Sequence, residues 1–170
     1  VYLWEHLLHD YQKARILTFL DPERDRLGAG WNIIQSKIAI GSGGLTGKGY
    51  LGGTQAKFEF LPASHTDFIF SVIGEELGFV GTVLVLALFA FVIWRALHIA
   101  AGVTNRFYSL MAIGLVSLIT FHVFVNIGMT IGVMPVTGIP LPFISYGGSA
   151  LLTNCTAIGL LLHAHTYRHE

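Results

Sequence analysis

The sequence predicts an all-α, polytopic helical membrane protein. Of its 170 residues, 53% are hydrophobic and only 12% are charged, far from the composition of a soluble domain. Three uncharged runs are each long enough to cross a bilayer, since about 20 helical residues span about 30 Å of hydrocarbon. These runs are Leu77–Trp94, Phe107–Met134 and Phe143–Ala164. Ten basic and ten acidic residues cancel, so the net charge gives no sign of a nucleic-acid partner.

The chain is predicted to form one membrane domain that begins inside a helix. Val1–Trp4 is apolar and lacks the initiator Met and basic region of a signal peptide, so we expect a fragment. The single cysteine, Cys155, is expected to be a core residue. We predict, in order, the end of a truncated helix (1–9), an extracytoplasmic loop (10–67), a spanning helix (68–95), a cytoplasmic loop (96–106), a second span (107–134), an outer re-entrant loop (135–145), a third span (146–165) and a cytoplasmic tail (166–170).

The segment between the last two spans cannot be helical throughout. Pro135, Pro140 and Pro142 interrupt it, and proline removes a helical hydrogen bond and restricts the residue before it. The segment is also uncharged and apolar. A loop of this composition suits a re-entrant position packed against protein.

Basic residues in the short connections predict the orientation. Arg95 and Arg106 bracket the first connection and Arg168 follows the last span, so with three crossings they lie on one side of the membrane. The positive-inside rule makes that side cytoplasmic, which places the C-terminus in the cytoplasm and Asp67 outside. The basic residues of 10–67 oppose this weakly, because they alternate with acids in a long loop.

A glycine-rich stretch at 28–53 precedes the first span. Gly47-Lys48 is followed by Gly49 where a P-loop needs Ser or Thr, and the G-x-G-x-x-G at 47–52 has no βαβ unit around it, so neither nucleotide motif holds. We expect instead an exposed loop whose backbone N–H groups, with a solvated Lys48, cradle an anion. Residues 31–40 are expected to form an amphipathic helix at the membrane surface.

Acidic residues stand at the mouth of the first span. Asp67, Ser71 and Glu75 follow at i, i+4 and i+8, with Gly74 and Gly78 near the same stripe, so this small, polar face is expected to line a groove. Intramembrane acids indicate a functional site by default. The alternative for Asp67 is a plain N-cap, and for Glu75 and Glu76 an interfacial pair bonded to neighbouring helices.

Two long motifs carry a resemblance to a known family. Leu61-Pro62 with His65–Gly78, and Pro140–Ser149, closely resemble two signatures of the SEDS family, whose members polymerise peptidoglycan in bacterial membranes. The chain is similar to the elongation (RodA-like) branch more than to the division (FtsW-like) branch. That leaning rests on 9–12, 20–23, 35–44 and 53–55. The resemblance covers essentially all 170 residues, but only the C-terminal part of a fold of roughly ten helices.

The resemblance implies a glycosyl transfer. A sugar hydroxyl of lipid II attacks the anomeric carbon of an undecaprenyl-diphosphate-linked glycan with inversion, which requires a base and neutralisation of the leaving diphosphate. The family's essential aspartate corresponds to Asp67, which would act directly or through a bound divalent cation, Mg²⁺ or Mn²⁺. The residues expected to bind substrate are Lys48, Gly43, Gly44, Ser71, Glu75, Ser145, Gly147 and Gly148.

The resemblance also implies partners and a place in the cell. It implies a class B penicillin-binding protein, the elongation machinery and the bacterial cytoplasmic (inner) membrane, with cell shape as the process served. Two other functions stay open at this point: a lipid II flippase, and a non-catalytic scaffold that docks the penicillin-binding protein. In the spans, His122, Asn126 and Asn154 are expected to make interhelical hydrogen bonds.

Overall fold

The computed structural model describes residues 9–25, 28–54 and 66–166. This part of the chain is helical without strands, as the sequence predicted. The predicted truncated helix, the motif residues Leu61-Pro62 and His65, and most of the predicted tail lie outside it. The elements are α2 (Asp10–Leu20), a 3-10 turn η1 (Pro22–Asp25), α3 (Ala29–Ser42), α5 (Ile69–Gly102), α6 (Arg106–Thr130) and α7 (Gly148–Thr166).

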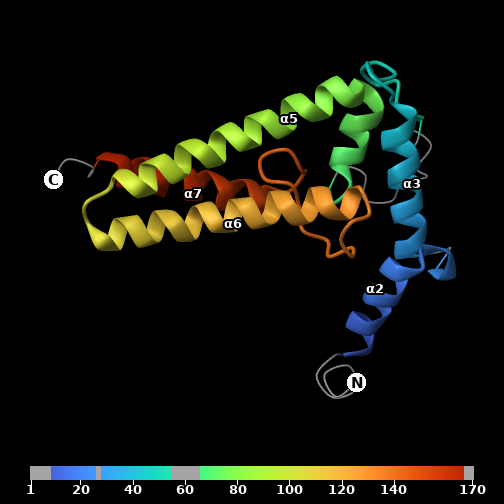
Figure 1. Ribbon diagram of the computed structural model, residues 1–170, viewed down its shortest axis with the longest axis horizontal. Helices are drawn as coiled ribbons and strands as arrows, with labels where there is room; N and C mark the ends of the chain where they lie inside the picture. The colour runs from blue at the N-terminus through green and yellow to red at the C-terminus, as the bar shows by residue number, and fades with distance from the viewer. Residues whose placement is uncertain (1–8, 26–27, 55–65, 167–170) are drawn as a thin grey trace.

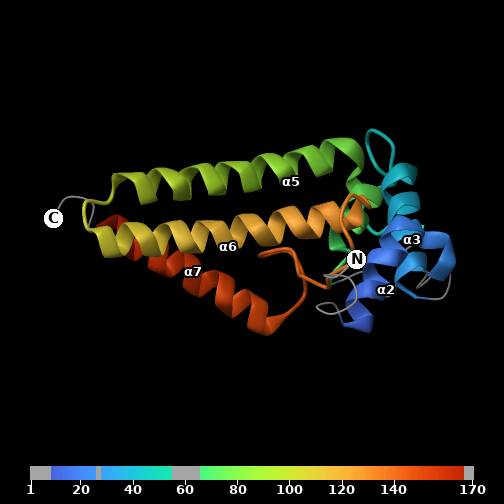
Figure 2. The same cartoon turned by 60° about the horizontal axis from the view of Figure 1, so that its bottom comes forward.

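Three long helices make up the body of the molecule. Figure 1 shows α5, α6 and α7 running along its long axis, while α2 and α3 lie across one end. In Figure 2, the C-terminal end of α7 lies beside the start of α6, and the two helices separate toward the start of α7. The core between the three helices includes small side chains, which allow close helix approach. Its members include Ala96, Ala100, Ala112, Val116, Ile119, Ala157 and Leu161.

Two of the three predicted spans correspond to helices that are apolar enough to cross a membrane. These are α5 and α6, which are also long enough. Helix α7 is shorter, with 19 residues, and it carries Asn154, His163 and His165. It begins at Gly148, five residues after the apolar run starts, because Phe143 has a φ of +64° and the chain turns there. Cys155 is exposed on this helix, so its predicted place in the core is wrong.

The first connection is shorter than predicted. Helix α5 continues to Gly102, so residues 96–102 are helical and the predicted loop at 96–106 shrinks to residues 103–105. Ala96, Ile99 and Ala100 are buried, and this packing continues the helix past Arg95.

Helix α6 also ends differently, at Thr130. Gly132 has a φ of +75°, and its N–H donates to the Met129 carbonyl at 3.2 Å. The Val133 N–H donates to the Gly128 carbonyl at 2.8 Å. This pair of bonds is a Schellman motif, which ends the helix four residues before the predicted 134.

Helix α5 is broken near its start, where the sequence predicted a continuous helix. Gly78 has φ 66° and ψ −160°, outside the helical region. Figure 1 shows the short first part, in green, turned steeply away from the long part. A side chain at Gly78 would collide with the Gly47 backbone, so the break depends on glycine.

The glycine loop at 43–49 supplies the hydrogen bonds that the break removes. Lys48 N donates to Glu75 O and Gly49 N to Glu76 O, both at 3.0 Å, so the end of the short part is capped. Phe79 N and Val80 N donate to the Gly44 and Leu45 carbonyls at 2.9 and 3.1 Å, which caps the start of the long part. One loop therefore satisfies backbone groups on both sides of the break.

Helix α3 packs against protein through one face. Ile33, Ser36 and Ala39 are buried. The Ser36 hydroxyl donates to the Thr130 carbonyl and shares a hydrogen bond with the Ser71 hydroxyl, each at 2.6 Å. The prediction of a helix here is confirmed, but its buried face lies on α5 and α6, so it is more than a surface anchor.

Candidate active site

Asp67 lies in the turn that leads into α5. The N-cap of this helix is Phe68, with φ −109° and ψ 22°, and no side chain caps it by a hydrogen bond. The alternative of Asp67 as a plain N-cap is therefore wrong. Asp67 is half-buried just before the start of α5, eleven positions ahead of the break at Gly78. A half-buried carboxylate without a capping task is suited to contact a ligand.

Asn126 of α6 holds the backbone at Asp67. Its Nδ2 group donates to the Asp67 carbonyl at 2.9 Å and to the Ile139 carbonyl at 2.8 Å. Asn126 is fully buried, so these two bonds form away from water. The amide thus joins α6, the start of α5 and the proline-rich loop, which is residues 131–147 between α6 and α7.

Ser145 makes a second connection at the same place. Its hydroxyl donates to the Thr66 carbonyl at 2.5 Å and accepts from Leu141 N at 2.8 Å. The predicted substrate-binding serine thus holds the proline-rich loop against the Asp67 turn. Leu141 and Pro142 are buried, in agreement with a loop packed against protein.

Gly138 brings the proline-rich loop against the carboxylate itself. Its φ is +75°, and a Cβ placed there would lie 3.4 Å from Asp67 Oδ2. A methyl group added at Gly138 would therefore be in ordinary van der Waals contact with the Asp67 carboxylate. The loop forms one wall of the carboxylate's surroundings.

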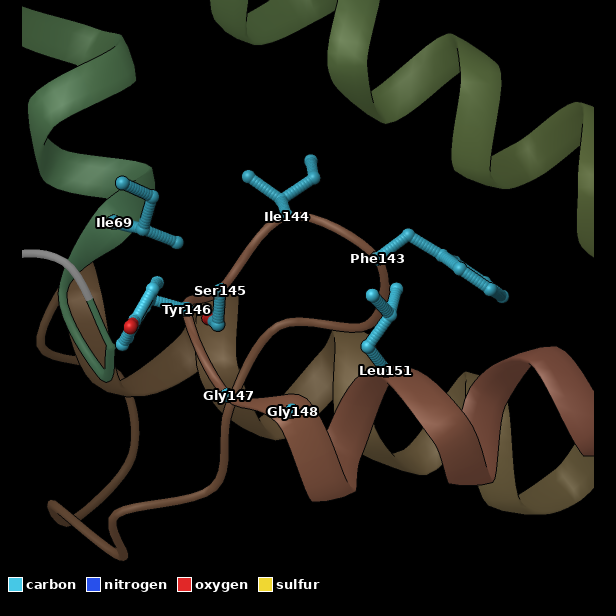
Figure 3. Close-up of a pocket in the computed structure, with 8 residues that line it drawn as sticks. All are labelled: Ile69, Phe143, Ile144, Ser145, Tyr146, Gly147, Gly148 and Leu151. Carbon is cyan, nitrogen blue, oxygen red and sulfur yellow. The ribbon is translucent and has the colours of Figure 1, made fainter.

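An apolar cavity of about 670 Å³ adjoins the Asp67 turn. Figure 3 shows Ile69 on the short part of α5 and Ile144 on the proline-rich loop facing the same space. Gly147 and Gly148 lie at its edge, where α7 begins. The cavity is lined by Ile69, Phe143, Ile144, Ser145, Tyr146, Gly147, Gly148 and Leu151.

The other predicted site residues on α5 point elsewhere. Glu75 is fully buried, and its Oε1 accepts from Lys48 Nζ at 2.7 Å, from Thr54 N at 2.7 Å and from Thr54 Oγ1 at 2.8 Å. Ser71 is buried against Ser36 of α3. The predicted groove stripe of Asp67, Ser71 and Glu75 is therefore divided, because α3 and the glycine loop cover its lower part.

The glycine loop also differs from the predicted anion cradle. Gly43 N donates to Ile40 O at 3.3 Å, Gly47 N to Gly43 O at 2.8 Å and Gly49 N to Glu76 O at 3.0 Å. Gly44 contributes its carbonyl to Phe79 N. These groups, and the Lys48 ammonium with them, are engaged within the protein. The observed task of the loop is to cap the broken helix.

The sequence did not connect two residues, Asn126 and Gly138, with Asp67. Asn126 was assigned to interhelical bonding in general, and Gly138 was not singled out. A buried amide in an otherwise apolar span, facing a loop rich in proline and glycine, is the signal that could have found them.

The whole chain matches the family described as cell cycle protein, which comprises FtsW, RodA and SpoVE, over residues 1–170. It is 56% identical over 166 residues to peptidoglycan glycosyltransferase MrdB of Escherichia coli strain K12, covering 98% of this chain and 45% of that protein. It is 51% identical to peptidoglycan glycosyltransferase RodA of Treponema pallidum, covering 92% of this chain and 36% of that one. The chain thus spans less than half the length of these relatives.

Solved structures give the same assignment. One, described as structural coordination of polymerization and crosslinking by a peptidoglycan synthase complex, superposes with a TM-score of 0.79 at 36% identity, covering 99% of this chain and 45% of that chain. An alanine mutant of the rod shape determining protein RodA of Thermus thermophilus superposes with a TM-score of 0.61 at 28% identity, covering 100% of this chain and 59% of that chain. The chain therefore belongs to the SEDS family of helical membrane proteins and is a RodA-like member of it.

Proposed function

We propose that the protein is a peptidoglycan glycosyltransferase that polymerises lipid II into glycan strands for cell elongation. The observation that carries this proposal is the turn at Asp67, whose backbone is held by Asn126 and, through the Thr66 carbonyl, by Ser145, next to an apolar cavity. Relatives at 56% and 51% identity bear the name peptidoglycan glycosyltransferase. The chain spans less than half of those relatives, so their named activity is a proposal for the protein that contains this chain.

Asp67 acts as the general base in this proposal. A carboxylate within hydrogen-bond reach of the acceptor sugar hydroxyl takes its proton as the oxygen attacks the anomeric carbon. The bond from that carbon to the diphosphate breaks, and the lipid diphosphate leaves with the electron pair. The apolar wall formed by Ile69, Phe143 and Ile144 excludes water from this step and suits a lipid-linked substrate.

The departing diphosphate needs compensation of its charge. Gly147 and Gly148 border the cavity at the start of α7, where backbone N–H groups and the helix dipole favour an anion. We place the diphosphate there rather than at Lys48, because the Lys48 ammonium lies 2.7 Å from Glu75 Oε1.

A divalent cation fits this site only as one shared with substrate. In residues 9–25, 28–54 and 66–166, no group of three His, Cys, Asp or Glu side chains could hold a metal ion. Mg²⁺ is commonly held by one or two carboxylates together with substrate phosphates. Asp67 would supply the protein ligand, and the ion would add charge compensation at the diphosphate.

The test is Asp67→Asn in the full-length protein with purified lipid II. We expect loss of glycan polymerisation, at least 100-fold, while the protein still folds and still binds a class B penicillin-binding protein. Full polymerisation by this variant would remove the catalytic assignment.

Two other functions remain as alternatives to this proposal. A flippase would move lipid II across a bilayer without forming glycan, and a scaffold would recruit the penicillin-binding protein and do neither. The solved structure described as a peptidoglycan synthase complex combines polymerisation with crosslinking. It therefore supports a crosslinking partner and also favours a polymerase over a scaffold that forms no glycan. A lipid II transport assay on the Asp67→Asn protein separates the flippase, because transport without polymerisation would support it.

A further inference from the structure

Asn126 is the buried polar group most closely connected with Asp67. It has no exposed surface, and its Nδ2 group donates at 2.9 Å to the carbonyl of Asp67 and at 2.8 Å to that of Ile139. Burying an amide in an apolar helix is unfavourable unless it is hydrogen-bonded. Here both bonds go to segments that carry or touch the same carboxylate.

The Asp67 carboxylate lies between the two segments that Asn126 holds. On one side is its own backbone, whose carbonyl accepts from Nδ2. On the other side is Gly138, adjacent to the second acceptor Ile139, where a Cβ would lie 3.4 Å from Asp67 Oδ2. One amide therefore joins the backbone of Asp67 to the loop that runs beside its carboxylate.

We propose that Asn126 is a positioning residue that fixes the Asp67 carboxylate for proton abstraction; this rests on the function proposed above. A second observation distinguishes it from a structural crosslink. Asn126 Oδ1 is buried and has no hydrogen-bond partner among the described residues. Burying an acceptor without a partner is unfavourable, so stability alone does not account for an amide at this place.

Positioning matters because proton transfer depends on a short, aligned contact. A general base works at about 2.6–3.2 Å from the proton-bearing oxygen, and a misplacement of about 1 Å lowers the rate roughly 100-fold. Asn126 is not among the residues that line the cavity, so substrate binding should depend on it weakly. Its loss should therefore lower kcat and leave KM nearly unchanged.

The experiment compares Asn126→Leu with Asn154→Leu in the full-length protein with lipid II. Leucine keeps the side chain's approximate volume and removes the donors. Asn154 is a matched control, a buried amide on α7 with 4% exposure. We expect kcat to fall roughly 10- to 100-fold in Asn126→Leu, with KM within about twofold and kcat of the control near wild type. A kcat like the control's, or a loss in KM alone, would overturn the proposal.

A second readout does not depend on turnover. Asp67→Cys is placed in a cysteine-free background, with Cys155→Ser, and its reaction with a small methanethiosulfonate is timed. Asn126→Leu should change the reaction rate at least about fivefold and Asn154→Leu should not, because burial and alignment control thiol access. Equal rates would overturn the positioning role. If Asn126→Leu changes the thiol reaction rate but the wild-type protein forms no glycan, the proposed function is wrong. In that case Asn126 still positions the side chain at residue 67.

If Asn126→Leu does not fold, Gly138→Ala is a second variant that tests the positioning of the Asp67 carboxylate. In this variant Asn126 stays in place. The added methyl group reaches ordinary contact with Asp67 Oδ2 at 3.4 Å, and it strains a backbone whose φ is +75°, so the loop beside the carboxylate should shift. A similar fall in kcat at unchanged KM supports the proposal. Wild-type kcat in a folded Gly138→Ala protein contradicts the tight placement on which it depends.

Discussion

The role of Lys48 in the structure is set by a single contact, with the Glu75 carboxylate. The sequence predicts a solvated lysine that helps to cradle an anion, and a solvated side chain contributes little to folding. In the structure its ammonium lies 2.7 Å from Glu75 Oε1, with the lysine side chain 30% and the glutamate side chain 0% exposed. The lysine thus compensates a carboxylate that has no contact with water.

Removing Lys48 should therefore affect stability first. We expect Lys48→Ala to lower the free energy of unfolding by about 1–3 kcal/mol, a value reduced for the partly exposed lysine, because the buried Glu75 carboxylate loses the Lys48 ammonium 2.7 Å away. Thermal unfolding in detergent measures this. The double variant Lys48→Met with Glu75→Gln should recover part of the loss, since no buried charge is then left uncompensated. Unchanged unfolding of Lys48→Ala would show that the ion pair contributes nothing.

At the residue scale, the sequence identified the acid but not its surroundings. Asp67 stands out because acids are rare at the mouth of an apolar run. Its neighbours Asn126 and Gly138 lie 59 and 71 positions further along the chain, and their relation to Asp67 depends on how α6 and the proline-rich loop pack. A spacing rule within one helix cannot contain that information.

At the scale of elements, helix existence was predictable and helix ends were not. Long uncharged runs predicted α5 and α6, because apolar side chains and satisfied backbone bonds both favour a helix in lipid. The break at Gly78 was missed because it is stabilised from outside, by the carbonyls of Gly44 and Leu45 and the N–H groups of Lys48 and Gly49. A glycine in a span is otherwise compatible with a straight helix.

The glycine loop offers a test of this packing. Gly41 and Gly43 both have ordinary backbone conformations, yet a Cβ at Gly43 would collide with the Gly74 carbonyl, whereas one at Gly41 meets nothing within 4 Å. We expect Gly43→Ala to destabilise the protein by about 1–3 kcal/mol. Gly41→Ala should be neutral or stabilising by up to about 1 kcal/mol. Thermal unfolding of the two variants side by side would show the difference, and equal midpoints would contradict a tight loop contact.

At the scale of the whole molecule, the orientation in the membrane stays a prediction. The family resemblance implies the bacterial cytoplasmic membrane, and Arg95, Arg106 and Arg168 predict the C-terminus inside and the Asp67 end outside. A reporter active only outside the cytoplasm should be active when inserted near Gly53 and silent when fused after Glu170. The opposite pattern would place Asp67 on the cytoplasmic side and remove the proposed reaction.

Dependence on a divalent cation can be tested on the full-length protein as well. We expect EDTA to reduce polymerisation at least about tenfold and Mg²⁺ or Mn²⁺ to restore it, because the ion neutralises the diphosphate. Calorimetric binding of Mn²⁺ in the presence of a non-reacting lipid diphosphate gives a readout besides activity, and Asp67→Asn should weaken it. Full polymerisation in EDTA would leave Asp67 acting as a base without a metal.

The break in α5 also sets the depth of the carboxylate in the bilayer. A straight helix of 34 residues would rise about 51 Å, which would lift Asp67 well clear of a hydrocarbon layer about 30 Å thick. The long part alone, Phe79–Gly102, rises about 36 Å, and the short part turns aside at Gly78. We therefore expect Asp67 to stay near the plane where the long part leaves the hydrocarbon, level with lipid headgroups. There the lipid diphosphate of the proposed reaction could meet it without being pulled out of the membrane.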